Sequence, residues 1–242
     1  MGFIHLHVHS QYSFLDGASS LDSLLNKACE LKMPAIALTD HNRLTGAVKF
    51  YEKAKKSGIK PIIGAEINFD RETHLTLLCK DKKGYSNLCQ LLTEAHLSNR
   101  GKTPFVSKES LSKFSGGLVV LSGCYKGELP SLVRDGRIEE AIIASRYYRE
   151  LFGNDFYIEL LRYPSREGMS SSYTLAKFAK EVNIPVVATN NVHYCKPGEY
   201  KIKELLNAID RNMAVSRLEG YRTVEQYLKS TKEMERLFRD IP

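Results

Sequence analysis

Three histidines near the N-terminus occupy alternate positions in the segment His5-Leu6-His7-Val8-His9-Ser10. Successive side chains of a β-strand point to opposite faces, so a strand here would place all three imidazoles on one face. Imidazole nitrogens are common metal ligands. The spacing therefore favours a metal site, with His7 and His9 at the strand end. The alternative is a polar strand face whose histidines are hydrogen-bonded within the protein.

Other candidate ligands follow apolar runs further along the chain. Asp40-His41 comes after Ala35–Leu38, Glu66 ends the run that begins at Pro61, and Asn191-Val192-His193 follows Pro185–Ala188. In α/β barrels the chemistry lies where the strands end. Each motif alone is weak, because an acidic residue at a strand end is often only a helix cap. Four strand ends at one rim would form a site of imidazoles and carboxylates, which suits zinc, manganese or iron.

The elements that must position these residues alternate along the chain. Strands are predicted over residues 3–8, 35–39, 61–67, 74–79, 117–122, 156–160 and 185–189. Helices are predicted over residues 21–32, 45–57, 85–97, 107–113, 129–134, 137–152 and 170–182. The segment from Tyr200 onward is expected to be helical, with a loop that contains Gly220. This alternation predicts an α/β fold with a parallel sheet, either closed or doubly wound.

Composition sets limits on the class of protein. The 242 residues suit one domain, and a net charge of +7 is as consistent with an anionic partner such as nucleic acid as with a merely solvated basic surface. The five cysteines form no CxxC pair, which argues against a disulfide framework and favours a reducing, cytoplasmic setting. No apolar run is long enough for a membrane span, and the N-terminus does not read as a signal peptide.

The motifs occur in a characteristic order: HxHS, LDG, TDH, GxE, SGC and a late NxVH. This order resembles the PHP (polymerase and histidinol phosphatase) family. The stretches HLHVHSQYSFLDG, KGYSNLCQLL, LSGCYKGELP and PVVATNNVHY are similar to the PHP domain that opens bacterial DNA polymerase III alpha subunits. The similarity runs from Phe3 to the end of the chain. The segment GASSLDSLLNKACEL leans toward the error-prone branch of these subunits.

The resemblance implies a distorted seven-stranded (β/α) barrel of the PHP type. Residues 1–242 would form the PHP domain, with the barrel over about 1–198 and a helical tail over about 199–242 that leads toward a polymerase region. It implies up to three divalent metals (Zn, Mn or Fe, with Mg as a further candidate). Carried over position by position, the implied ligands are His7, His9, Asp16, His41, Glu66, His74, Cys124, Asn191 and His193. The implied catalytic set is His7, His9, Asp16, His41, Glu66 and His193.

One position departs from the family pattern. The late motif normally has Asp where this chain has Asn191. An amide offers a neutral carbonyl oxygen in place of a carboxylate, so the site loses one negative charge. Coulomb energies between close charges are large, and one metal is therefore expected to bind more weakly.

The function implied by the resemblance is metal-dependent hydrolysis of a phosphoester, as a 3′–5′ proofreading exonuclease in DNA replication. The expected partners are DNA, the remaining polymerase domains of the same chain and other replisome subunits, with no membrane. One alternative is a structural or interaction domain that stabilises the polymerase. The other is a stand-alone phosphatase of the histidinol phosphatase type.

Four residues have expected supporting roles. Asp40 is expected to accept a hydrogen bond from a ligand imidazole, or else to cap the segment that follows it. His5 is a candidate proton donor to the leaving oxygen. Arg43 and Arg162 are candidate phosphate ligands.

Overall fold

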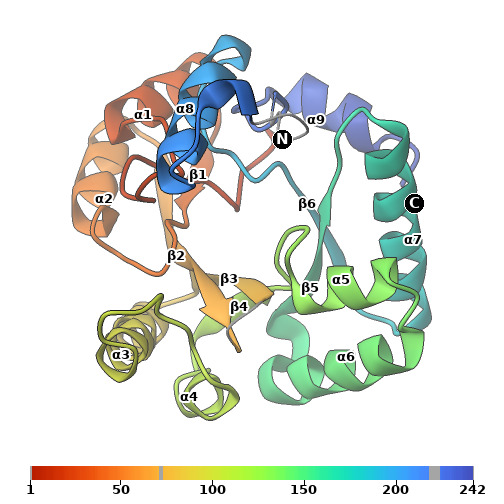
Figure 1. Ribbon diagram of the computed structural model, residues 1–242. Coiled ribbons are helices and arrows are strands. Elements are labelled where there is room, and N and C mark those ends of the chain that lie inside the picture. The colour runs from red at the N-terminus through yellow and green to blue at the C-terminus, as the bar shows by residue number, and fades with distance from the viewer. Residues whose placement is uncertain (1, 71–72, 218–223, 242) are drawn as a thin grey trace. The chain divides into compact units, whose positions relative to one another are not determined.

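The computed structural model describes residues 2–70, 73–217 and 224–241. The chain divides into two compact units. Unit 1 comprises residues 1–63 and 190–236, and unit 2 comprises residues 64–189 and 237–242. Figure 1 shows the elements of both units along the chain.

Six strands are present in the described residues, and each is hydrogen-bonded to the next along the chain. They are β1 (Ala35–Leu38), β2 (Lys60–Phe69), β3 (Thr73–Cys79), β4 (Leu118–Leu121), β5 (Phe156–Leu161) and β6 (Val186–Thr189). The α/β class is confirmed, but the expectation of a parallel sheet is wrong for β3, which runs antiparallel to both β2 and β4. Only three residues separate β2 from β3, too few for the crossover that a parallel pair requires.

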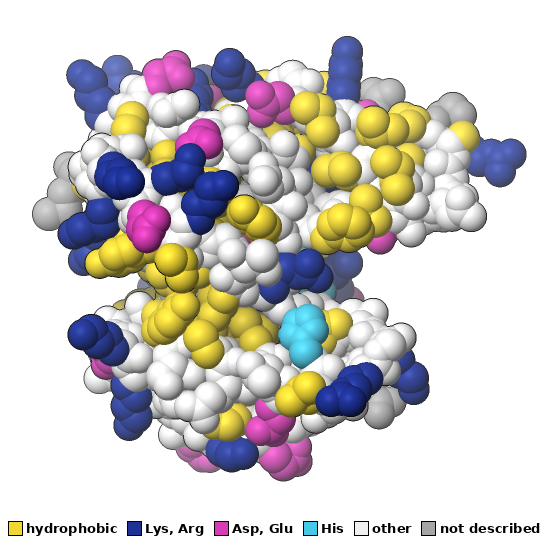
Figure 2. All heavy atoms as spheres, turned by 90° about the vertical axis from the view of Figure 1, so that its left-hand side faces the viewer, with side chains coloured by type: hydrophobic (Ala, Val, Ile, Leu, Met, Phe, Trp, Pro, Cys, Tyr) yellow, Lys and Arg dark blue, Asp and Glu magenta, His cyan; other side chains and the backbone are white. Residues whose placement is uncertain are grey.

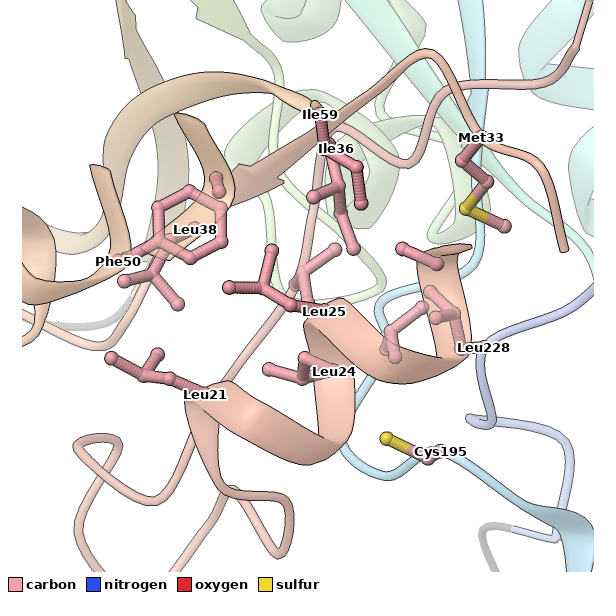
Figure 3. Packing of buried hydrophobic residues seen from close by; sticks show 14 residues of the cluster. Leu21, Leu24, Leu25, Met33, Ile36, Leu38, Phe50, Ile59, Cys195 and Leu228 are labelled. Atoms are coloured by element: carbon pink, nitrogen blue, oxygen red, sulfur yellow. The ribbon is translucent and has the colours of Figure 1, made fainter. Parts of the chain in front are cut away.

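Unit 1 contains β1, the first residues of β2, and the helices α1 (Leu21–Glu30), α2 (Ala47–Lys56) and α8 (Tyr200–Asp210). Its core is a cluster of buried apolar side chains from α1, α2 and β1, from their connections, and from the segments around Val8, Val192 and Leu228. Figure 3 shows Leu21, Leu24 and Leu25 of α1 in this cluster with Ile36, Leu38 and Phe50. Helix α1 begins at the N-cap Ser20, whose hydroxyl accepts a hydrogen bond from Ser23 N.

The N-terminal segment occupies the place of a strand without the regular ladder predicted for residues 3–8. Only Val8 forms a bridge, with Val192. On one side, His5 O and Val8 O accept from Ala37 N and Thr39 N at 2.9 and 2.8 Å. On the other side, His7 O accepts from Val192 N, and His9 N donates to Val192 O at 2.7 Å. These bonds fix the histidines in the interior of unit 1, where His5, His7 and His9 are fully buried.

Unit 2 contains the rest of β2, strands β3–β6 and five helices. These are α3 (Lys82–Ser98), α4 (Lys108–Lys113), α5 (Glu128–Arg134), α6 (Ile138–Phe152) and α7 (Arg166–Glu181). Helices α3 and α7 begin three and four residues earlier than predicted. The side chains of Asp81 and Ser165 cap them by accepting from the backbone N–H groups of Gly84 and Gly168. Figure 1 shows α5, α6 and α7 gathered around β5.

The remaining elements are short. They are the 3₁₀ turns η1 (Gly153–Asp155), η2 (Pro197–Glu199) and η3 (Val215–Arg217), and helix α9 (Thr231–Phe238). Helices α8 and α9 lie in the segment from Tyr200 onward that was expected to be helical, whereas the predicted loop around Gly220 lies outside the described residues. No helix in the described part of the chain has the length and apolarity needed to cross a membrane. On the face shown in Figure 2, basic side chains lie at several separate places among acidic ones.

Candidate metal centre

Four chain segments bring histidines and a carboxylate together in unit 1. His9 ends the N-terminal segment, His41 follows β1, His193 follows β6, and Asp16 lies in the turn between the N-terminal segment and α1. One ligand atom each from His9, Asp16 and His193 lies within 4.8 Å of the others. The predicted convergence of these strand ends is therefore present in unit 1.

The imidazoles are packed against one another. The Nε2 atoms of His7 and His9 are 3.1 Å apart. The ring of His9 stacks on those of His41 and His193, with centroid separations of 4.8 and 4.4 Å. So many buried ring nitrogens in so small a volume form a donor set suited to a cation.

A tight turn presents Asp16 to this cluster. Leu15 has a φ of +58°, and the α-carbon of Gly17 lies so close to the backbone of Ser10 that a β-carbon there would be 2.0 Å from Ser10 O. Glycine is therefore required in the LDG motif. The Asp16 carboxylate lies 2.9 Å from His193 Nε2 and 3.4 Å from His41 Nε2.

The protonation of His193 follows from its two neighbours. Its Nδ1 lies 2.8 Å from the carbonyl oxygen of Asn191, which can only accept, so Nδ1 carries a proton. Its Nε2 faces a carboxylate oxygen of Asp16, which is also an acceptor when ionised. A neutral imidazole would direct a lone pair at that oxygen. A cation at this edge, either a second proton on the ring or a metal bound by both atoms, would satisfy both the lone pair and the ionised carboxylate.

Asn191 has a second feature that suits a ligand. Its side-chain oxygen Oδ1 is buried, and it accepts no hydrogen bond from the described residues. A buried acceptor without a donor is costly, and coordination of a cation would satisfy it. Asn191 adopts a left-handed backbone conformation with a φ of +43°.

A serine fixes the tautomer of His9. The Ser13 hydroxyl donates its single proton to Asp40 Oδ1 at 2.7 Å and accepts from His41 N at 3.1 Å. It lies 2.9 Å from His9 Nδ1, and since its proton is used, Nδ1–H must be the donor. His9 therefore presents the lone pair of Nε2. Asp40 also accepts from Ser10 N and Ser10 Oγ at 2.7 and 2.8 Å.

A second group lies in unit 2. The β2–β3 register pairs Glu66 with Thr76, so Glu66 and His74 lie on the same face of the sheet. Glu66 Oε1 is 3.0 Å from His74 Nδ1 and 3.6 Å from Cys124 Sγ. Burial, together with the negative charges of Glu66 and Glu159, raises the pKa of Cys124 well above its usual value. The Cys124 thiol is therefore protonated and donates to Glu66.

A family comparison identifies this arrangement of motifs. The model of the PHP domain family matches residues 5–162, which is more than half of the chain. The chain belongs to the PHP domain family. Its curated relatives include the error-prone DNA polymerase of Symbiobacterium thermophilum, at 39% identity over 262 residues, and the DNA polymerase III subunit alpha of Borreliella burgdorferi, at 38% over 257. These alignments cover 100% and 99% of the chain, but only 24% and 22% of the relatives' own length.

Solved structures share the fold of this PHP domain. An amidohydrolase from Chromobacterium violaceum has a TM-score of 0.57 at 14% identity, and covers 78% of this chain and 87% of its own. A putative metal-dependent phosphoesterase from Bifidobacterium adolescentis has a TM-score of 0.54 at 15% identity, with the same two coverages. At such low identity these matches show the fold alone.

Three buried residues of the PHP domain were missed in the sequence. Ser13 orients His9, as described above. Lys203 of α8 forms an ion pair with Asp16, although burial lowers the pKa of Lys203 to about 7. Glu159 of β5 is buried and accepts a hydrogen bond from Thr189 at 2.5 Å. Ser13 could have been found from its spacing of four residues after His9, whereas Lys203 and Glu159 have no motif around them.

Three of the four supporting residues, Asp40, His5 and Arg162, have contacts that differ from their expected roles, and the expected role of Arg43 stays a prediction. Asp40 acts on His9 through Ser13 rather than directly. His5 Nε2 donates to Lys229 O, and burial lowers the pKa of His5 to about 4, so it is a poor proton donor near neutral pH. The guanidinium of Arg162 is buried and binds both carboxylate oxygens of Asp240, which leaves it unsuited to phosphate. Arg43 Nε is buried and has no hydrogen-bond partner in the described residues.

The Ser13 network predicts the tautomer of His9. In the metal-free chain we expect His9 to carry its proton on Nδ1, and Ser13→Ala to raise the fraction protonated on Nε2, because the acceptor for Nδ1–H is lost. Long-range ¹H–¹⁵N correlation spectra of the imidazole distinguish the two forms. Ser23→Ala, at an exposed serine of α1, is the control. An unchanged His9 spectrum in Ser13→Ala would contradict this assignment.

Burial of His5 predicts a pH dependence of stability. Its pKa is 6.5 in the unfolded chain and about 4 in the folded one, so between these values the unfolded chain binds more protons. The free energy of unfolding therefore falls as the pH drops from 6.5 to 4, by up to about 3 kcal/mol from this residue. His5→Gln, which keeps a donor for Lys229 O, should flatten that part of the profile in urea unfolding. An equal slope in both proteins would show that His5 does not titrate as described.

Proposed function

We propose that this chain is the PHP domain of a DNA polymerase III alpha subunit and that it hydrolyses phosphoesters with bound divalent metals. The observation that carries the proposal is the group of His9, Asp16 and His193, whose ligand atoms lie within 4.8 Å of one another. The relatives that match nearly all of the chain are polymerase subunits. The proposed reaction is removal of a 3′ nucleotide from DNA.

The donor chemistry of both units supports metal binding. In unit 1 the proposed ligands are His7, His9, Asp16, His41, Asn191 and His193, and in unit 2 they are Glu66, His74 and Cys124. Nitrogen and carboxylate donors with one thiol suit Zn²⁺, Mn²⁺ or Fe²⁺ better than Mg²⁺, which prefers oxygen ligands. The buried Asn191 Oδ1 and the His193–Asp16 edge both fit a cation. We propose up to three ions.

When bound, the metals would supply Lewis-acid activation of water and of the phosphate oxygens. The chain's own residues prepare the ligands for this. Ser13 and Asp40 hold His9 so that its Nε2 lone pair is presented. The Asn191 carbonyl holds the ring of His193 in the same way. Lys203 balances the charge of Asp16 in a buried setting.

Several finer features belong to this proposal. The N-terminal segment, bonded on both sides like a strand, would be the seventh strand of a PHP-type barrel. Residues 1–242 would act as one PHP domain, with a barrel over about 1–198 and a tail over about 199–242. The proposed partners are DNA, further polymerase domains and other replisome subunits, and the proposed location is the cytoplasm.

A purely structural role is the second candidate. Asn191 removes a negative charge that the family motif normally supplies, and the Cys124 thiol must lose a strongly held proton before it can bind a metal. Both features weaken metal binding. A stand-alone histidinol-phosphatase-type enzyme is less well supported, because the matched relatives are polymerase subunits.

Nuclease activity tests the proposal. With Mn²⁺ or Zn²⁺ the chain should shorten 5′-labelled single-stranded DNA from its 3′ end, and EDTA should abolish this. His9→Ala should lower the rate at least ~100-fold, because the central ligand is lost. His96→Ala, at an exposed histidine of α3, should leave the rate unchanged. Wild-type activity no higher than that of His9→Ala would leave the structural role as the better reading.

The charge at position 191 provides a separate test. Asn191→Asp should tighten binding of the weakest metal on the order of tenfold, because it adds a carboxylate to a buried site. Calorimetric titration of the metal-free chain with Mn²⁺ measures this directly, beside the nuclease rate. If neither quantity changes, Asn191 does not limit the site.

A further inference from the structure

Unit 2 contains a cavity of about 600 Å³ between helices α5 and α7 and the ends of β4 and β5. Sites for small organic ligands have volumes of this order. Cys124 and Glu159, both buried, lie in its lining. Apolar side chains such as Val133, Leu161 and Leu175 contribute another part of the wall.

An aromatic ring and a guanidinium form part of this lining. Tyr125, the residue after Cys124, is 61% exposed. The guanidinium carbon of Arg134 lies over its ring, 4.1 Å from the centroid. A planar cation on one face of a tyrosine leaves the other face for a second planar group. Nucleobases stack on such aromatic platforms irrespective of their sequence.

Backbone hydrogen bonds hold the loop that carries the Tyr125 ring. Arg134 Nη1 donates to Tyr125 O at 2.9 Å, and Gly127 N donates to Cys124 O at 2.8 Å. Gly123 has a φ of +82°, and a β-carbon there would lie 2.1 Å from His74 O, so the loop depends on glycine. Because the loop is fixed before a ligand arrives, little entropy is lost when a ligand stacks on the ring.

Hydroxyl groups line the side of the cavity formed by α7. Ser165 caps the helix, and Ser170, Ser171 and Thr174 lie in its first turns. Hydroxyls can hydrogen-bond a sugar or a phosphate oxygen without fixing base identity. A ligand with an acyl chain is disfavoured, because it would offer these hydroxyl groups no hydrogen bonds. A ligand that was mostly phosphate would need more cations than Arg134, which is already paired with Asp135 at 3.4 Å.

We propose that this cavity binds a terminal nucleotide of single-stranded nucleic acid, with its base stacked on Tyr125. The inference rests on the proposed nuclease function and names the substrate group that this part of the chain recognises. Tyr125 directly follows Cys124, a proposed metal ligand, so the stacking ring and the metal-binding group of unit 2 share one rigid loop. Tyr125 is a positioning residue and takes no part in the chemistry.

Oligonucleotide binding in EDTA tests this subsite without hydrolysis. The probe is a fluorescein-labelled single-stranded oligodeoxynucleotide, followed by fluorescence anisotropy. Tyr125→Ala should weaken binding roughly tenfold or more, the usual effect of losing one stacked base. Tyr125→Phe should bind like wild type, because the ring is retained. The control is Tyr173→Ala: Tyr173 is also exposed and has Lys177 over its ring, but it lies outside the cavity lining.

A second probe isolates the base. The second probe is an oligonucleotide of equal length whose terminal nucleotides are abasic. Wild type should bind it as weakly as Tyr125→Ala binds the intact probe. Tyr125→Ala should bind the abasic probe no more weakly than wild type does. No binding by wild type, or equal binding by Tyr125→Ala and Tyr173→Ala, would overturn the subsite. Tyr125-dependent binding without any hydrolysis would instead remove the nuclease proposal and retain the subsite. Hydrolysis that is unaffected by Tyr125→Ala would instead remove the subsite and retain the nuclease proposal.

Discussion

The free-energy cost of burying ionisable groups is the constraint on which the rest of unit 1 depends. His7 and His9 are fully buried, the partly buried Asp16 lies beside His9, and the buried Lys203 is paired with Asp16. A buried charge is tolerated only when it is paired or hydrogen-bonded, because the protein interior solvates it poorly. Each polar atom near the cluster therefore needs a defined partner, and the surrounding elements must hold that partner within hydrogen-bonding distance.

The partners are arranged in a consistent way. Where a histidine presents one nitrogen to the centre, its other nitrogen is fixed from behind: Ser13 serves His9, and the carbonyl of Asn191 serves His193. Such outer contacts orient ligand imidazoles and fix their tautomers. The apolar cluster of α1, α2 and β1 supports these contacts, since it anchors the segments on both sides of Val8 and Val192. Packing of the core therefore holds in place the groups that fix which ring nitrogen of His9 and of His193 carries the proton.

Local patterns predicted most of this molecule, and long-range contacts account for what they missed. The spacing of apolar residues located the helices and the six strands, and the motif order located the histidines and the carboxylate that cluster in unit 1. The direction of β3 was predicted wrongly because the residue pattern of a strand does not show whether the strand runs parallel or antiparallel to its neighbour. Only the short connection between β2 and β3 shows that the two are antiparallel. Lys203 could not be found because its contact with Asp16 joins residues 187 positions apart in the chain. Glu159 likewise depends on the neighbouring Thr189 of β6.

The backbone at Asn191 restricts how this site can vary. A left-handed conformation costs least for glycine, asparagine and aspartate, although Leu15 also adopts it in the turn before Asp16. Glycine has no side-chain oxygen, so asparagine and aspartate are the residues that combine this backbone conformation at low cost with an oxygen that could serve as a ligand. These have almost the same size and differ by one unit of charge. Exchange between Asn and Asp at position 191 would therefore change the electrostatic potential of the site without changing its shape.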